Sequence, residues 1–291
     1  MVDRIGTIIA AIDHCKGNTL SRGELFIDRE FLTRYFSSER GGYIEQLKIA
    51  CESFDLDLIG IDIHDDSWES LMLRNEYRKL KDFFIVGLLD GPFNTMRKQK
   101  GFEEAMLDLK SDPSSYTRVT SKLLEELKNL LTLFKENSFK GVALLEDIAG
   151  NQGLMMSRTD FENLIYPFYK SAVSMIKQNG LYAFFHSDGN LWNILEYILD
   201  AGFDCVHCVD SQAGMDLYKL KEVCGKRITL MGHIDLLAWD EKKIELEIEQ
   251  AEKEFISGGL ILGSSCGLST LVPPSRIKAL YQEWKFASIS I

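Results

Sequence analysis

The chain has 291 residues, a formal net charge of −11 and a hydrophobic fraction of 45%. This length suits one (β/α)8 barrel, which commonly has about 250 residues, and no Pro-, Gly- or Ser-rich stretch suggests a linker between two domains. The acid excess gives the protein no electrostatic reason to bind a phosphate backbone, so we expect no nucleic-acid partner. No segment approaches the roughly 18 apolar residues of a membrane span, so we expect no membrane partner either.

The first residues, MVDRIGTIIAAIDHC, read as an amphipathic helix interrupted by charges rather than as a secretory signal. The chain also has six cysteines, most of them inside apolar runs. This usage is typical of a reducing compartment, where thiols stay free or bind a metal. We therefore expect the protein to be cytoplasmic.

From about residue 57, short apolar runs alternate with longer segments that have helical periodicity. This alternation predicts parallel strands joined by crossover helices. The nearly continuous hydrophobicity of each run is typical of strands that are buried on both faces. The seven predicted strands span residues 57–63, 83–89, 141–147, 181–186, 203–209, 227–232 and 259–263.

An eight-stranded barrel needs one strand more than the seven predicted. Residues 287–291, or a segment near residues 25–27, could supply the eighth. An open doubly wound sheet is the alternative, but no glycine-rich phosphate-binding motif follows any of the predicted strands, which disfavours it. The predicted fold class is therefore α/β: a single TIM-type barrel domain over residues 1–291, with an N-terminal helical extension over residues 1–55.

Local signals mark the ends of several predicted helices. Ser157 and Asp160 resemble a capping box at the start of one helix, Pro167 predicts a kink inside it, and Gly180 is well placed to end it. The Glu-rich segment 241–254 carries apolar residues at helical spacing, which predicts an amphipathic helix with a solvated face.

Polar residues that end the predicted strands are the candidate site residues, because function in a parallel barrel is located at the carboxyl ends of its strands. Strands also end where solvent begins, so polar residues occur there without any function. The candidates for catalysis are Glu146, Asp147, His207 and Asp62. The candidates for substrate binding are Asn190, His233, Asp235 and Asp90. His64 and Asp210 lie at strand ends as well.

His186 and Asp188 are the strongest pair in this set. Residues two apart on a strand share a face, so both side chains should point into the mouth of the barrel. There they could bind a metal or share a proton, although the histidine could also simply be satisfied by the aspartate. With Cys266, at the end of a glycine-rich strand, they make a set of nitrogen, oxygen and sulfur ligands that suits zinc. Glu146 could complete a tetrahedral site or act as a base.

Cys205 and Cys208 have the spacing of a metal knuckle. No second cysteine pair accompanies them, and residues three apart on a strand face opposite sides. We therefore expect His207, between them, to be the better candidate for a site residue.

Five segments in chain order carry a family resemblance: GLLDGPFNTM (87–96), LLEDIAGNQGLMMSRTDFENLIYPFYK (144–170), FHSDGNLWNILEYILDAGFDCVH (185–207), ITLMGHID (228–235) and GGLILGSSCGLSTLVPPSRIKAL (258–280). Together they resemble the uroporphyrinogen decarboxylase superfamily over roughly residues 57–284. This superfamily includes the decarboxylase, corrinoid-dependent methyltransferases and cobalamin-independent methionine synthases. The resemblance implies a distorted (β/α)8 barrel.

The methyltransferase branch binds zinc through a His-x-Cys-Gly strand end and a later cysteine that a proline-rich turn follows. His186 and Cys266 match this pattern, and Asp188 stands in place of the middle cysteine. The resemblance implies a zinc ion that acts as a Lewis acid on a thiol or ether substrate. It also implies methyl transfer between that small substrate and a corrinoid protein, which would dock at the mouth of the barrel.

Two other functions stay open. The decarboxylase branch uses no cofactor and holds substrate carboxylates with arginines in a motif resembling M-R-Q-A-G-R, which is absent here. A metal-free decarboxylase of a porphyrinogen or another polycarboxylate would have to rely on the arginines Arg22, Arg74, Arg97 and Arg158. Asp62 loosely corresponds to the catalytic aspartate of that branch. The third possibility is a non-enzymatic barrel that binds a small molecule.

Overall fold

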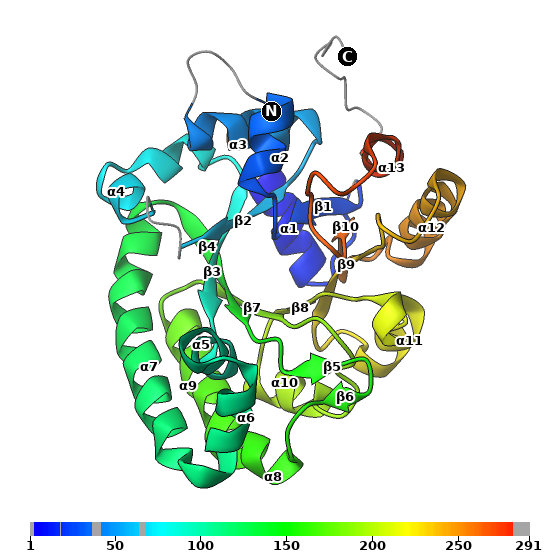
Figure 1. The fold of residues 1–291 in the computed structure, drawn as a ribbon. Helices are drawn as coiled ribbons and strands as arrows, with labels where there is room; N and C mark the ends of the chain where they lie inside the picture. Colours follow the sequence, from blue (N-terminus) through cyan, green and yellow to red (C-terminus); the bar gives the residue numbers. More distant parts are fainter. Residues whose placement is uncertain (1–2, 18, 37–41, 64–67, 282–291) are drawn as a thin grey trace.

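Eight parallel strands close into a barrel in the computed structural model, which describes residues 3–17, 19–36, 42–63 and 68–281 (Figure 1). Around the barrel the strands follow the order β1-β10-β9-β8-β7-β4-β3-β2. This closed arrangement confirms the predicted barrel and excludes the open doubly wound sheet. The strands are β1 (Ser21–Glu24), β2 (Leu58–Asp62), β3 (Phe84–Asp90), β4 (Phe139–Leu145), β7 (Tyr182–His186), β8 (Cys205–His207), β9 (Thr229–Ile234) and β10 (Leu260–Ser264).

Helices surround the barrel, and a short antiparallel pair, β5 (Ala149–Gly150) with β6 (Gly153–Leu154), follows β4 (Figure 1). No helix among the described residues is long and apolar enough to cross a membrane. The α-helices are α1 (Arg4–Ile12), α2 (Arg29–Phe36), α3 (Tyr43–Ser53), α4 (Trp68–Leu73), α5 (Pro92–Lys100), α6 (Phe102–Ser111), α7 (Pro113–Glu136), α8 (Arg158–Asp160), α9 (Tyr166–Gln178), α10 (Leu195–Ala201), α11 (Leu217–Cys224), α12 (Glu241–Glu254) and α13 (Pro274–Leu280).

The eighth strand is β1, which ends directly before the segment 25–27 and lies within the predicted helical extension. Its sequence, SRGE, is too polar to be recognised as a buried strand. Ser21 Oγ donates a hydrogen bond to the Leu260 carbonyl at 2.7 Å, and Gly23 lies where a Cβ would come within 2.8 Å of Leu58. The strand is therefore buried through specific partners rather than through hydrophobicity. The other proposed strand, 287–291, lies outside the described residues.

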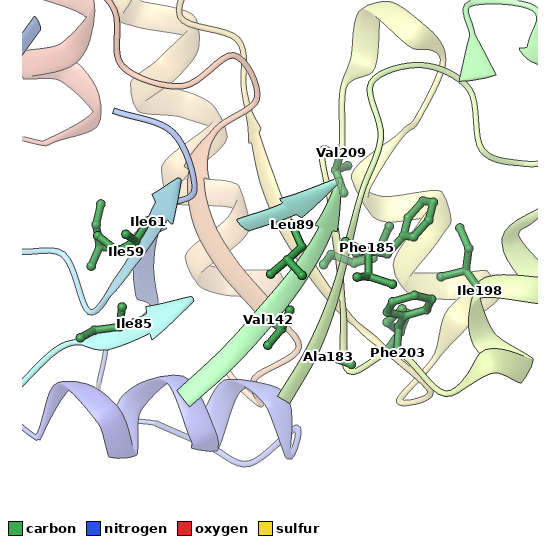
Figure 2. Packing of buried hydrophobic residues seen from close by; sticks show 14 of the residues in the cluster. Ile59, Ile61, Ile85, Leu89, Val142, Ala183, Phe185, Ile198, Phe203 and Val209 are labelled. Atoms are coloured by element: carbon green, nitrogen blue, oxygen red, sulfur yellow. The ribbon is translucent and has the colours of Figure 1, made fainter. Parts of the chain in front are cut away.

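Side chains alternate between the two faces of each strand, so the buried residues form one layer inside the barrel and one outside it. Residues such as Phe84, Val86 and Phe184 fill the barrel interior, while their neighbours pack outward against the helices. In the outer layer, Figure 2 shows Phe185 and Phe203 on the side of Ile198 from α10, and their two rings lie 5.3 Å apart. Since Phe184 points inward, His186, two residues later, also faces the interior at the carboxyl end of β7.

Helix α1 closes the amino-terminal end of the barrel. Ile8 and Ala11 are buried within the interior layer, together with Leu58 and Met231. The Ala11 carbonyl accepts a hydrogen bond from Gly259 N at 2.8 Å. Helix α1 thus covers this end of the barrel, and the opposite end carries the predicted site residues.

The local helix signals are confirmed. Ser157 caps α8 by accepting a hydrogen bond from Asp160 N at 3.1 Å. A π-helical turn then precedes Pro167, at the start of α9, because proline has no N–H to continue the α-helical pattern. Gly180 follows the helix with a φ of +72°.

Glu24 links β1 to β10 and to the segment after α13. Its fully buried carboxyl group accepts hydrogen bonds from Ser264 N at 2.9 Å, Ser264 Oγ at 2.8 Å and the Tyr281 hydroxyl. Burial raises the pKa of Glu24 to about 7, although these three donors act in the opposite direction. The closure of the barrel therefore depends on a carboxyl group that titrates near neutral pH.

We expect Ile8→Ala to destabilise the protein by about 2–5 kcal/mol, because it opens a cavity where α1 plugs the barrel. The exposed Leu246 on α12 supplies the control: Leu246→Ala should change stability by less than about 0.5 kcal/mol. Urea unfolding of both variants measures this. Equal small effects would show that α1 does not hold the interior layer together.

Glu24→Gln tests the buried carboxyl group. The wild-type pKa is about 7 in the folded state, above its ordinary value of 4.5, so the folded state holds a proton that the unfolded chain releases. Stability of the wild type should therefore fall as pH rises from 4.5 toward 7, relative to the variant, which cannot titrate. Urea unfolding across this range measures the difference, and parallel pH profiles for the two proteins would contradict it.

Candidate metal centre at the barrel mouth

The loops after β4 and β7 run side by side at the carboxyl end of the barrel. Backbone pairing continues past the strands: Glu146 N donates to the His186 carbonyl at 2.8 Å, and Ser187 N donates to the His207 carbonyl at 3.0 Å. Gly189 has a φ of +106°, and a Cβ there would lie 2.3 Å from the Ala149 carbonyl oxygen. Only glycine allows this close approach.

Three ligand side chains meet where these loops converge. Among the residues that the structure describes, Asp147, His186 and Asp188 form the one group able to hold a metal ion, with ligand atoms that all lie within 4.8 Å of one another. His186 Nε2 lies 3.7 Å from Asp147 Oδ1 and 3.9 Å from Asp188 Oδ1. Ligands of a tetrahedral zinc with bonds of about 2.1 Å lie about 3.4 Å apart. A small contraction would therefore complete such a site.

Asp147 is held in place by groups from α5. Arg97 donates to Asp147 Oδ2 at 2.8 Å, and Asp147 N donates to Asn94 Oδ1 at 3.1 Å. The other carboxylate oxygen, Oδ1, accepts a hydrogen bond from Asp188 N at 3.4 Å and faces His186. One oxygen is thus fixed by an arginine while the other remains directed into the ligand group.

His186 lies at the bottom of this group and is almost fully buried. Its Nδ1 lies 2.8 Å from Nδ1 of His207, and its ring packs edge-on against Phe26, with centroids 4.9 Å apart. Burial lowers the pKa of His186, whereas Asp188 and Asp147 raise it. Burial lowers the pKa of His207 well below its ordinary value, and His186 lowers it further. Both rings are therefore neutral near pH 7, which is the form that binds metals.

Glu146 lies next to this group but is fully buried. Its carboxyl oxygens accept hydrogen bonds from Phe93 N at 2.9 Å and Asn94 N at 3.5 Å, at the start of α5. Burial raises the pKa of Glu146 to about 8, and Asp90 and Asp147 add to this effect. The contacts of this predicted catalytic residue tie α5 to the mouth.

Three of the predicted substrate-binding residues have partners within the rim. Lys98 donates to Asp90 at 2.6 Å, Asn190 donates to the Ala213 carbonyl at 3.0 Å, and Asp235 Oδ1 accepts hydrogen bonds from Leu237 N and Ala238 N at 2.9 and 2.8 Å. Asp62, a predicted catalytic residue, is exposed at the end of β2. His64 lies outside the described residues.

His233 is directed away from the mouth. Its Nε2 lies 3.1 Å from Glu247 Oε2 on α12, and its ring packs edge-on against Trp239. Alternation along β9 predicts the opposite direction, but Gly232 and His233 have φ values of +103° and +88°. This irregular backbone turns the ring toward the helices.

Cys266 is exposed at the mouth and is not a member of the three-residue ligand group. Its Sγ lies 3.4 Å from the Gly267 carbonyl. Partial desolvation of its sulfur, with a smaller contribution from the charge of Glu24, raises the pKa of the Cys266 thiol to about 12. Cys208 is buried, which raises the pKa of its thiol well above its ordinary value, and the charge of Asp188 adds to this effect. Zinc binding by Cys266 stays a prediction, and the geometry offers Asp147 as the third ligand.

The sequence did not reveal Phe26 and Asn94 as neighbours of the site. Phe26 follows the unrecognised strand β1, and Asn94 lies in the first turn of α5, where polar residues commonly face solvent. The segment GLLDGPFNTM was the one signal that included Asn94, through the family resemblance.

Comparisons with known proteins agree with this architecture. The family model described as uroporphyrinogen decarboxylase (URO-D) matches residues 72–285. No curated protein sequence matches the chain.

Solved structures show the same fold. A methyltransferase from Methanosarcina mazei is 16% identical, with a TM-score of 0.76 and coverage of 98% of each chain. An endo-beta-1,4-mannanase from Cellulomonas fimi is 11% identical, with a TM-score of 0.58 over 97% of this chain and 74% of that one. An L-ribulose 3-epimerase is 12% identical, with a TM-score of 0.53 over 94% and 89%. At such low identities the likeness concerns the fold alone, whereas the family model spans most of the sequence: the chain belongs to the uroporphyrinogen decarboxylase (URO-D) family.

Proposed function

We propose that this protein is a zinc-dependent methyltransferase that moves a methyl group between a small substrate and a corrinoid carried by a partner protein. The observation that carries the proposal is the convergence of His186 Nε2 with one oxygen each of Asp147 and Asp188 at the barrel mouth. The solved methyltransferase of the same fold supports this branch of the family.

The three donors fit a catalytic zinc site. Such sites have three protein ligands and keep one position open, and zinc accepts both imidazole nitrogen and carboxylate oxygen. Asp188 is exposed, so the open position would face the mouth. Bound zinc would supply a Lewis acid that lowers the pKa of a substrate thiol.

The residues around the donors are suited to orienting such a substrate. Arg97 neutralises part of the charge on Asp147, and Phe26 covers one side of the His186 ring. A thiol or another small neutral substrate would enter without having to displace an ion pair. We also propose the cytoplasm as the location of the protein, since all six cysteines are free.

The charges at the mouth disfavour a decarboxylase of a polycarboxylate. Arg97 and Lys98 reach the candidate site, and they are already paired with Asp147 and Asp90. Arg22 N bonds Asp57, and both line a cavity of about 490 Å³ beside α1 at the amino-terminal end. Arg158 is occupied by Glu162 and Tyr197 on the outer helices. A substrate with many carboxylates would therefore meet a predominantly acidic surface.

We expect the purified protein to bind one zinc ion, as measured by metal analysis and by calorimetric titration of the metal-free form. Asp147→Asn should weaken zinc binding by more than about tenfold, because it removes the charge of a ligand oxygen. Asp62→Asn is the matched control: it removes a carboxylate at the end of β2, outside the ligand group, and should leave the affinity unchanged.

The variant Cys266→Ser separates two possible ligand sets. If Cys266→Ser loses zinc while Asp147→Asn keeps it, the thiol replaces Asp147 as the third ligand. A wild-type protein without stoichiometric metal would refute the zinc-dependent function.

Activity can be tested with methylcobalamin in place of the corrinoid protein. The zinc-loaded enzyme and a panel of small thiols should consume methylcobalamin, seen as a change in its visible absorbance, and yield the methylated thiol. His186→Ala should abolish this reaction. Release of CO2 from uroporphyrinogen, with no methyl transfer to any thiol, would instead assign the protein to the decarboxylase branch.

A further inference from the structure

The contact between His186 and His207 restricts where their protons lie. The two Nδ1 atoms are 2.8 Å apart, a distance that requires a hydrogen bond. In such a bond one nitrogen carries the proton and the other offers a lone pair. With both rings neutral, each ring has a single N–H, so the assignment for one ring determines the other.

The surroundings of the two rings favour one assignment. The Ser264 backbone raises the pKa of His207, which is the direction expected when a backbone carbonyl lies near a ring N–H. A Cβ placed on Gly232 would lie 3.4 Å from the Ser264 carbonyl oxygen and 3.5 Å from His207 Nε2. Both atoms therefore lie beside Gly232. His186 Nε2 makes no hydrogen bond to Asp147 or Asp188, which lie 3.7 and 3.9 Å away. This geometry favours a proton on His186 Nδ1, with Nδ1 of His207 as the acceptor and the His207 proton on Nε2.

It follows that His186 donates through Nδ1 and has a lone pair on Nε2. That lone pair faces the carboxylate oxygens of Asp147 and Asp188 at 3.7 and 3.9 Å, distances too long for a hydrogen bond. Three electron-rich groups thus converge without a proton between them. This arrangement suits a cation and is otherwise repulsive.

We propose that His207 is a positioning residue: it holds His186 in the tautomer whose Nε2 is free to bind a metal, and relays this constraint from the Ser264 carbonyl. The metal-binding consequence rests on the proposed function, whereas the tautomers are a property of the protein alone. His207 is 1% exposed, so in this proposal it acts through His186 rather than directly on a substrate. Partners of this kind commonly contribute 10- to 100-fold to metal affinity.

Nitrogen NMR of the metal-free protein tests the tautomers directly. Two-bond proton–nitrogen correlation spectra near pH 7.5 should show His186 protonated on Nδ1 and His207 protonated on Nε2. The variants His207→Asn and His14→Asn assign the signals, since the protein has five histidines. An Nε2-protonated or doubly protonated His186 would overturn the inference.

A pair of isosteric variants tests the positioning role. Asn at position 207 can place an amide oxygen near the position of Nδ1 and accept the proton of His186, whereas Leu cannot. His207→Leu should weaken zinc binding by about 10- to 100-fold, and His207→Asn should recover most of that loss. His14→Asn, at the other end of the barrel, should have no effect, since Asn tolerates the φ of +50° there. Circular dichroism establishes that each variant is folded.

The outcomes distinguish this inference from the proposed function. Equal affinities for the Leu and Asn variants, or an unchanged affinity in His207→Leu, would overturn the positioning role while zinc binding by the wild type stands. The expected tautomers in a protein that binds no zinc would refute the zinc-dependent function and leave the proton assignment intact.

Discussion

The hydrogen bond between His186 and His207 is the interaction on which the barrel mouth depends. It joins the ends of β7 and β8, and it turns Nε2 of His186 toward Asp147 and Asp188. The two aspartates alone would not indicate a metal site, because exposed acidic groups commonly occur without a bound metal. The neutral, buried imidazole of His186 uses its proton in the hydrogen bond to His207. Its Nε2 lone pair therefore points at the two aspartates and is shielded from bulk water, which makes the three side chains a better metal site.

The rest of the fold holds His186 and its neighbours in these positions. Phe184 fills the barrel interior and so determines that His186, two residues later, faces the mouth. Helix α1 covers the opposite end, and Glu24 joins β1 to Ser264, whose carbonyl oxygen lies beside Gly232, as does Nε2 of His207. The residues that close the barrel thus lie, through Ser264, next to the residues that orient the candidate ligands.

Much of this could be predicted from the sequence, because buried parallel strands have a strong hydrophobic signal and strand alternation places side chains reliably. Seven strands, the inward direction of His186 and its proximity to Asp188 follow from these rules. These rules could not predict the polar strand β1, because its burial depends on partners more than 200 residues away, such as Leu260. They also could not predict the direction of the His233 ring, because positive φ angles break the alternation of side chains along β9. The convergence of Asp147 with His186 depends on contacts with α5, which no local pattern encodes.

The central claim is that the metal site consists of nitrogen and oxygen ligands from Asp147, His186 and Asp188. X-ray absorption at the zinc edge, on zinc-loaded protein without substrate, tests it most directly. The account predicts a first shell of nitrogen and oxygen atoms at about 2.0–2.2 Å, with no sulfur. A sulfur ligand at about 2.3 Å would contradict it and would bring Cys266 or Cys208 into the site.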